Sequence, residues 1–194
     1  KAILDNPGSR DAKFDSVRFP ISAASGIADE IVNRWENEYS HVIRQYYGLT
    51  ETSPFASGNF SLEPRMGSIG MPAPSTIMLV ADPENHARIL GPGETGELLI
   101  SGPQLTSGYL DDPEATAAAI KDGWLLTGDL GYMDNEGYFY ITGRKKEMYI
   151  VGGEKVWPSI VDRVIEELGV VDKAATVGLP KPGTSDHEIV SVVV

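Results

Sequence analysis

Hydrophobic residues in the first part of the chain follow a helical spacing. Between residues 29 and 39, Ile31, Val32 and Trp35 recur at positions that share one face of a helix. The segment opens with two acidic side chains, which suit the positive end of a helix dipole. We therefore predict a helix over residues 29–39.

Two further helices are predicted mainly from the signals at their ends. Segment 112–120 opens with an aspartate that can cap the helix and with a proline at the first helical position. Segment 159–168 begins after Pro158 and is followed by Gly169, at the position beyond a helix end that glycine prefers. These signals place one helix in the middle of the chain and one near its end.

Short apolar runs between turn sequences predict strands over much of the remaining chain. They are residues 17–22, 41–47, 76–81, 87–90, 97–100, 124–127, 130–133, 138–142, 174–179 and 188–194. Asp-Asn-Glu-Gly at 134–137 predicts a hairpin turn. Residues 91–96 fit G-x-G-x-x-G, but a dinucleotide site needs a helix after that pattern and a strand follows here. The whole pattern predicts an α/β fold with a strand-rich middle.

Composition narrows the class of protein. The 194 residues carry 16 basic and 28 acidic side chains, and this net charge of −12 argues against nucleic acid or an anionic membrane as an electrostatic partner. The chain has no cysteine, which excludes thiolate metal sites and cysteine nucleophiles and suits a reducing, cytoplasmic compartment. No apolar run approaches the roughly 20 residues of a membrane helix. The chain starts at Lys1 and ends in a strand-like run, so we expect a piece of a longer protein.

Two motifs combine groups that can bind a nucleotide. Residues 46–51, Tyr-Tyr-Gly-Leu-Thr-Glu, offer a ring for a base, a hydroxyl for a phosphate oxygen and a carboxylate for Mg²⁺. The alternative is a strand end with an exposed turn. In residues 124–131, Asp129 lies between glycines at a strand edge, where a carboxylate can accept hydrogen bonds from both hydroxyls of a ribose. The alternative here is an ordinary turn aspartate.

Two later motifs are weaker when taken alone. In residues 140–146, Arg144 offers a planar, always charged group for a phosphate or a sugar, and the alternative is a solvated basic turn. In residues 152–158, two glycines allow close backbone approach or a positive φ. The order and spacing of all four motifs together are far more specific than any one of them.

Taken together, the motifs resemble those of the ATP-dependent adenylate-forming enzymes, which include acyl-CoA synthetases, aryl-CoA ligases and the adenylation domains of peptide synthetases. The resemblance runs from about Val17 to Val194. The residues that carry it are 22–25, 47–51, 96–98, 107–109, 127–129, 143–144 and 152–158. It implies that residues 1–143 are the distal part of a large nucleotide-binding domain with a β-rich subdomain, and that residues 144–194 begin a small α+β lid domain.

The resemblance also assigns roles to individual residues. The nucleotide-binding residues that it implies are Ala23, Ala24, Ser25, Tyr47, Gly48, Thr50, Asp129, Ile141 and Arg144. The alanines and Ser25 would lie along the adenine, and Tyr47 would stack on it. Thr50, Glu51 and Arg144 are the implied catalytic residues, with Glu51 as the metal ligand. Lys146 would be the hinge of the lid domain, and Gly152 and Gly153 would line the tunnel for CoA and the acyl group.

The implied activity is ATP-driven activation of a small-molecule carboxylate to an acyl-adenylate, followed by transfer to CoA. ATP or AMP, Mg²⁺ and CoA are the expected cofactors and co-substrates. A carrier-protein thiol as acceptor, or a non-catalytic nucleotide-binding remnant, remain alternatives. The phosphate loop and the C-terminal lysine of the family are absent from this chain, so we expect that the chain alone does not form an acyl-adenylate.

Overall fold

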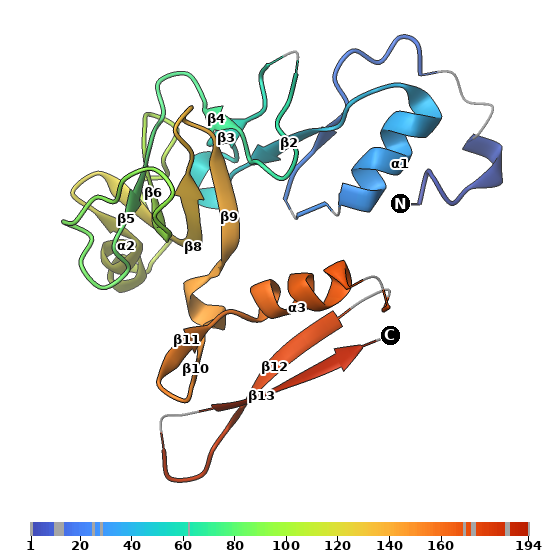
Figure 1. The fold of residues 1–194 in the computed structure, drawn as a ribbon. Helices are drawn as coiled ribbons and strands as arrows, with labels where there is room; N and C mark the ends of the chain where they lie inside the picture. The colour runs from blue at the N-terminus through green and yellow to red at the C-terminus, as the bar shows by residue number, and fades with distance from the viewer. Residues whose placement is uncertain are drawn as a thin grey trace. The chain divides into compact units, whose positions relative to one another are not determined.

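The computed structural model describes residues 2–9, 14–24, 26–27, 29–61, 63–168, 170–171, 174–184 and 187–193 (Figure 1). The chain divides into two compact units. Unit 1 comprises Lys1–Leu79, Leu99–Leu126 and Met133–Tyr140, and unit 2 comprises Val80–Leu98, Thr127–Tyr132 and Ile141–Val194. Helices and strands are mixed throughout, as the sequence predicts. No helix within the described residues is long and apolar enough to cross a bilayer.

The first helix of unit 1, α1 (Asp29–Tyr39), has the predicted bounds. Val32 on its apolar face is fully buried. Trp35 and Tyr39 pack against each other and against the ring of Phe14, with ring centroids 4.6 to 5.4 Å apart. Packing of these aromatic rings buries large apolar surfaces and so stabilises the position of α1. A short 3₁₀ helix, η1 (Pro7–Ser9), precedes it.

A four-stranded sheet in unit 1 has the order β1-β2-β3-β4. Its strands are β1 (Ile21–Ser22), β2 (Arg44–Tyr47), β3 (Ser57–Gly58) and β4 (Met71–Pro72). β1 is parallel to β2, and the other pairs are antiparallel. The predicted strands 17–22 and 41–47 are both longer than the observed ones. Pro20 has no N–H for a ladder, although its carbonyl accepts the N–H of Arg44 at 2.9 Å.

A second sheet has five strands in the order β5-β6-β8-β7, with β9 also paired to β8. The strands are β5 (Ile77–Ala81), β6 (Gly96–Ser101), β7 (Ile120–Lys121), β8 (Trp124–Met133) and β9 (Phe139–Arg144). The prediction of separate strands at 124–127 and 130–133 is wrong, because β8 is continuous through Gly128, which has φ +72°. The predicted strand 87–90 is also wrong. Only a single bridge between Ala81 and Ile89 forms there.

Local signals in the middle of the chain are confirmed. Helix α2 (Pro113–Ala119) is capped by Asp112, whose Oδ1 accepts the N–H of Ala115 at 2.9 Å. The hairpin turn at 134–137 forms as predicted, and the N–H of Asp134 donates to the carbonyl of Tyr138 at 2.9 Å. The G-x-G-x-x-G segment is a turn that leads into β6, as the sequence predicts.

The C-terminal part of unit 2 contains β10 (Tyr149–Val151), β11 (Glu154–Val156), α3 (Pro158–Glu167), β12 (Ala174–Pro180) and β13 (His187–Val193). The hairpin β10–β11 was not predicted from the sequence. Helix α3 packs on β12, and β12 pairs with β13 in antiparallel fashion (Figure 1). Gly169, the predicted helix stop, and Val194, the end of the last predicted strand, lie outside the described residues.

Candidate functional site

In unit 1, the motif Tyr47–Glu51 lies where β2 ends and a 3₁₀ helix, η2 (Thr50–Thr52), begins. Tyr47 is 9% exposed, whereas Thr50 is exposed at the surface. The fully buried hydroxyl of Thr52 accepts the N–H of Leu49 and donates to its carbonyl, both at 2.9 Å. These bonds fix the turn and thereby set the positions of Thr50 and Glu51.

Gly48 allows this turn to pack against another stretch of backbone. A Cβ atom on Gly48 would lie 1.8 Å from the carbonyl oxygen of Pro54 and 2.9 Å from the Cα of Phe55. No side chain fits there without a shift of the main chain. Gly48 therefore shapes the segment that carries Tyr47 and Thr50, and the structure gives it no contact that identifies a ligand.

The carboxylate of Glu51 has a partner that the sequence analysis missed. The hydroxyl of Tyr109 donates to Glu51 Oε1 at 2.5 Å, and the carbonyl of Glu51 accepts the N–H of Thr106 at 2.8 Å. The hydrogen bond to the Glu51 carboxylate raises the pKa of Tyr109, so the phenol stays protonated at neutral pH. Residues 107–109 belong to the motifs of the family resemblance, and this was the signal available in the sequence.

Ala23 and Ala24 follow β1 and are both exposed. Because β1 and β2 are parallel, their C-terminal ends lie at the same end of the sheet. The residues after β1 and the residues after Tyr47 therefore leave the sheet on that side. Ala24 has φ +74°, a conformation that a small residue adopts more readily than a bulky one. Ser25, the third residue predicted for this part of the site, lies outside the described residues.

In unit 2, Asp129 and Arg144 form an ion pair. Arg144 Nε lies 2.9 Å from Asp129 Oδ1, and the side chains are 62% and 4% exposed respectively. Asp129 lies on β8, and its N–H donates to Thr127 Oγ1 at 3.0 Å. That hydroxyl in turn donates to the carbonyl of Leu98 at 2.8 Å. A nearly buried carboxylate is thus held on the sheet and faces a guanidinium that extends into solvent.

The other predicted residues of unit 2 lie at or beyond the end of β9. Ile141 lies on β9 and is 38% exposed. Lys146 lies in a 3₁₀ helix, η3 (Lys145–Glu147), which follows Arg144 directly. Gly152 and Gly153 form the turn of the β10–β11 hairpin with φ values of 60° and 87°, and the space around both is open. The structure brings Asp129 and Arg144 together and places the glycines at a hairpin tip.

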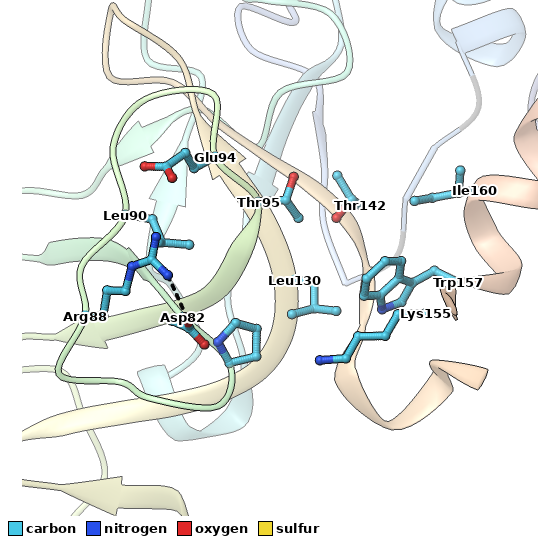
Figure 2. A pocket seen from close by; sticks show the side chains of 11 residues that line it. Asp82, Arg88, Leu90, Glu94, Thr95, Leu130, Thr142, Lys155, Trp157 and Ile160 are labelled. Carbon is cyan, nitrogen blue, oxygen red and sulfur yellow. Dashed lines mark hydrogen bonds and ion pairs between the residues drawn. The ribbon is translucent and has the colours of Figure 1, made fainter. Parts of the chain in front are cut away.

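Unit 2 also contains a pocket of about 580 Å³ (Figure 2). Its lining residues are Asp82, Pro83, Arg88, Leu90, Glu94, Thr95, Leu130, Thr142, Lys155, Trp157 and Ile160. Its lining combines acidic and basic side chains with the apolar Leu130 and Trp157, and Arg88 pairs with Asp82 at 3.3 Å (Figure 2). None of the predicted site residues that the structure describes lines this pocket.

Known proteins resemble this chain in sequence and in fold. A family model described as AMP-binding enzyme matches residues 1–110. The chain is 36% identical to a long-chain-fatty-acid–CoA ligase of Bacillus subtilis over 92% of its own length and 32% of the relative's. It is 35% identical to an indoleacetate–CoA ligase of Aromatoleum aromaticum over 91% of its length and 34% of the relative's. The chain thus spans about a third of these relatives.

Solved structures agree with this result. ATP-bound MatB from Rhodopseudomonas palustris superposes with a TM-score of 0.88 and is 29% identical, over 98% of this chain and 38% of that protein. The α/β fold class and the resemblance to adenylate-forming enzymes are therefore confirmed. The chain belongs to the family of AMP-binding enzymes.

Proposed function

We propose that this chain supplies nucleotide-binding residues to an acid–CoA ligase. The ligase joins a carboxylic acid to AMP, with release of pyrophosphate, and then transfers the acyl group to CoA. The observation that carries the proposal is the nearly buried Asp129 paired with Arg144, in a chain of the AMP-binding family. The names of the two curated relatives, both acid–CoA ligases, support the same reaction class.

Asp129 would accept hydrogen bonds from the two ribose hydroxyls of ATP. A carboxylate with little exposure to water forms stronger hydrogen bonds than one in solvent, because the local dielectric constant is lower. The Arg144 guanidinium pairs with this carboxylate at 2.9 Å and offers further N–H donors. The pair therefore supplies both acceptors for the sugar and donors for a nearby oxygen of the nucleotide.

The end of β2 would bind the base and the phosphates. Tyr47 would stack on the adenine, with Ala23 and Ala24 lying along it, because small side chains let a planar base approach the main chain. Thr50 would donate to the α-phosphate. In unit 2, Ile141 would offer apolar surface to the nucleotide.

Glu51 would be the protein ligand of Mg²⁺. Magnesium prefers oxygen ligands and is commonly held by one or two carboxylates together with substrate phosphates. Within the described residues no group of three or more metal-binding side chains exists. A single carboxylate held by Tyr109 fits a metal that ATP brings with it. The metal would neutralise charge on the phosphates while Thr50 and Arg144 hold the oxygens.

The remaining assignments concern the second half-reaction. We place the boundary between the large domain and the lid at residues 143 and 144, with Lys146 as the hinge residue. Hinges are short segments between elements that absorb a change in backbone angles. Gly152 and Gly153 would approach the CoA thiol and the acyl group. We also place the protein in the cytoplasm, where ATP and CoA are available.

The proposal is tested by a pyrophosphate-release screen of the full-length protein with aliphatic, aromatic and amino acids, with and without CoA. Release with one class of acid, together with a CoA-dependent thioester, is the expected result. Release without use of CoA would favour a carrier-protein thiol as the acceptor. The absence of release with every acid, despite ATP binding, would contradict the ligase and favour a nucleotide-binding remnant.

Tyr109→Phe tests the assignment of Glu51 as the metal ligand. The variant loses the hydroxyl that orients the Glu51 carboxylate, an interaction worth about 1 kcal/mol at a partly exposed site. We expect the Mg²⁺ concentration for half-maximal activity to rise about fivefold. The control is Tyr138→Phe, which keeps the ring that lies under the Arg65 guanidinium. An unchanged Mg²⁺ requirement in Tyr109→Phe would argue against Glu51 as the ligand.

A further inference from the structure

Unit 2 contains a buried carboxylate, Glu97 on β6, to which the sequence analysis assigned no role. It is 3% exposed. Its Oε1 accepts the N–H of Gly128 at 3.0 Å. Its Oε2 lies 2.8 Å from His86 Nε2 and 3.2 Å from Lys145 Nζ. His86 lies 11 positions before Glu97, and Gly128 and Lys145 lie 31 and 48 positions after it.

The charge on Glu97 is held by these neighbours. Burial alone raises the pKa of a carboxyl group, but hydrogen bonds from His86, Lys145 and Gly128 outweigh that effect and lower the pKa of Glu97. The carboxylate is therefore ionised at neutral pH. A buried carboxylate without its partners would destabilise the folded protein. The contacts of Glu97 with His86, Lys145 and Gly128 therefore resist rearrangement.

Two of the three residues that contact Glu97 are sequence neighbours of the Asp129–Arg144 ion pair. Gly128 directly precedes Asp129, and Lys145 directly follows Arg144. Gly128 adopts φ +72°, and its N–H donates to the Glu97 side chain. Lys145 is anchored a second time, by the carbonyl of Pro83 at 2.5 Å. One carboxylate thus binds a neighbour of each member of the ion pair.

The ion pair needs such support. Arg144 is 62% exposed, and a pair with one member in solvent is weak by itself and easily exchanges for water. A ribose is held well only if both carboxylate oxygens are already oriented, because ordering them on binding costs affinity. Fixing the backbone on both sides of the pair removes that cost.

We propose that Glu97 is a positioning residue for the nucleotide site: its carboxylate holds Gly128 and Lys145 so that Asp129 and Arg144 stay oriented toward the ribose. The inference rests on the proposed function and deepens it. Glu97 touches no reacting atom and acts through its two neighbours. Its removal affects recognition of the ribose hydroxyls more than recognition of the rest of the nucleotide.

The test is Glu97→Gln in the full-length protein, with ATP and 2′-deoxy-ATP as paired probes. The amide keeps the shape and can still accept from Gly128, but it carries no charge to hold Lys145 and His86. We expect the Kd for ATP to rise about tenfold and the preference for ATP over 2′-deoxy-ATP to shrink by a similar factor. A merely structural role would weaken both nucleotides equally and leave the preference intact.

The control is Glu94→Gln, which removes another carboxylate that accepts a backbone N–H, that of Gly91 at 2.7 Å. It is expected to change neither value. Lys145→Met gives a second readout if Glu97→Gln does not fold, since the Lys145 side chain is 39% exposed and its loss leaves Glu97 with two partners. It should reduce the preference for ATP in the same direction.

The outcomes separate the inference from the proposed function. If the unmodified protein binds no ATP, the proposed function is contradicted and the inference falls with it. If it binds ATP and prefers it to 2′-deoxy-ATP, while folded Glu97→Gln or Lys145→Met keeps the full preference, the inference alone is overturned. A reduced preference in these variants, with Glu94→Gln unchanged, supports it.

Discussion

Gly48→Ala should lower the free energy of unfolding by about 3 kcal/mol or more, at the upper end of the range for overpacking. The added methyl group would lie 1.8 Å from the carbonyl oxygen of Pro54 and 2.7 Å from its carbonyl carbon. Both are backbone atoms, so relief requires the main chain to move. Urea unfolding of the full-length protein, followed by tryptophan fluorescence, measures the loss.

Gly26→Ala is the matched control for this prediction. Gly26 is exposed, has no positive φ, and has no atom within 4 Å of the position of an added Cβ. Its substitution should change the free energy of unfolding by less than about 0.5 kcal/mol. If Gly48→Ala is as stable as Gly26→Ala, the close contact of Gly48 with Pro54 does not exist in solution. We expect Gly48→Ala to weaken ATP binding as well as stability, because Tyr47 and Thr50 flank the turn that contains Gly48.

Asp129→Asn should weaken ATP binding about 100-fold, which corresponds to about 3 kcal/mol lost from two hydrogen bonds to an ionised group. The asparagine keeps the size of the side chain but cannot form the ion pair with Arg144, and it offers one oxygen acceptor in place of two. Equilibrium binding of ATP to the full-length protein measures the change.

Asp122→Asn is the control, because it removes the same charge from an exposed turn residue. It should bind ATP as the unmodified protein does. The assignment of Asp129 to the ribose leads to a second expected result. In Asp129→Asn, ATP and its 2′-deoxy analogue should bind with nearly equal affinity. An Asp129→Asn protein that is folded and still binds ATP with unchanged affinity would contradict that assignment.

The elements that the sequence predicted well are those set by local interactions. The bounds of α1 follow from the spacing of its own apolar residues, and Asp112 caps α2 through an N–H only three residues away. The continuity of β8 could not be predicted from the residues within and around it. Its Gly128 is bonded to Glu97, 31 positions earlier in the chain, so a glycine that looks like a strand break is held within the sheet.

The candidate site shows the same contrast between features set by local sequence and features set by distant residues. Glu51 and Asp129 are predicted as site residues because each belongs to a short motif, whereas the residues that hydrogen-bond to them or to their neighbours come from distant segments. Tyr109 lies 58 positions from Glu51, and Glu97 belongs to a different strand from Asp129. No spacing rule connects such pairs. The hairpin of β10 and β11 was missed for a simpler reason, since Gly152 and Gly153 were interpreted as allowing close backbone approach or a positive φ and not as a turn between two strands.

The most direct test of the proposed chemistry uses a carboxylic acid labelled with oxygen-18 in its carboxylate, selected by the pyrophosphate-release screen. Attack of the carboxylate on the α-phosphorus of ATP forms a bond from a labelled oxygen to that phosphorus. Thiolysis by CoA then breaks the bond between the acyl carbon and that oxygen. We expect one labelled oxygen in AMP and none in pyrophosphate, as measured by mass spectrometry. Label in inorganic phosphate, with ADP as the other product, would contradict it.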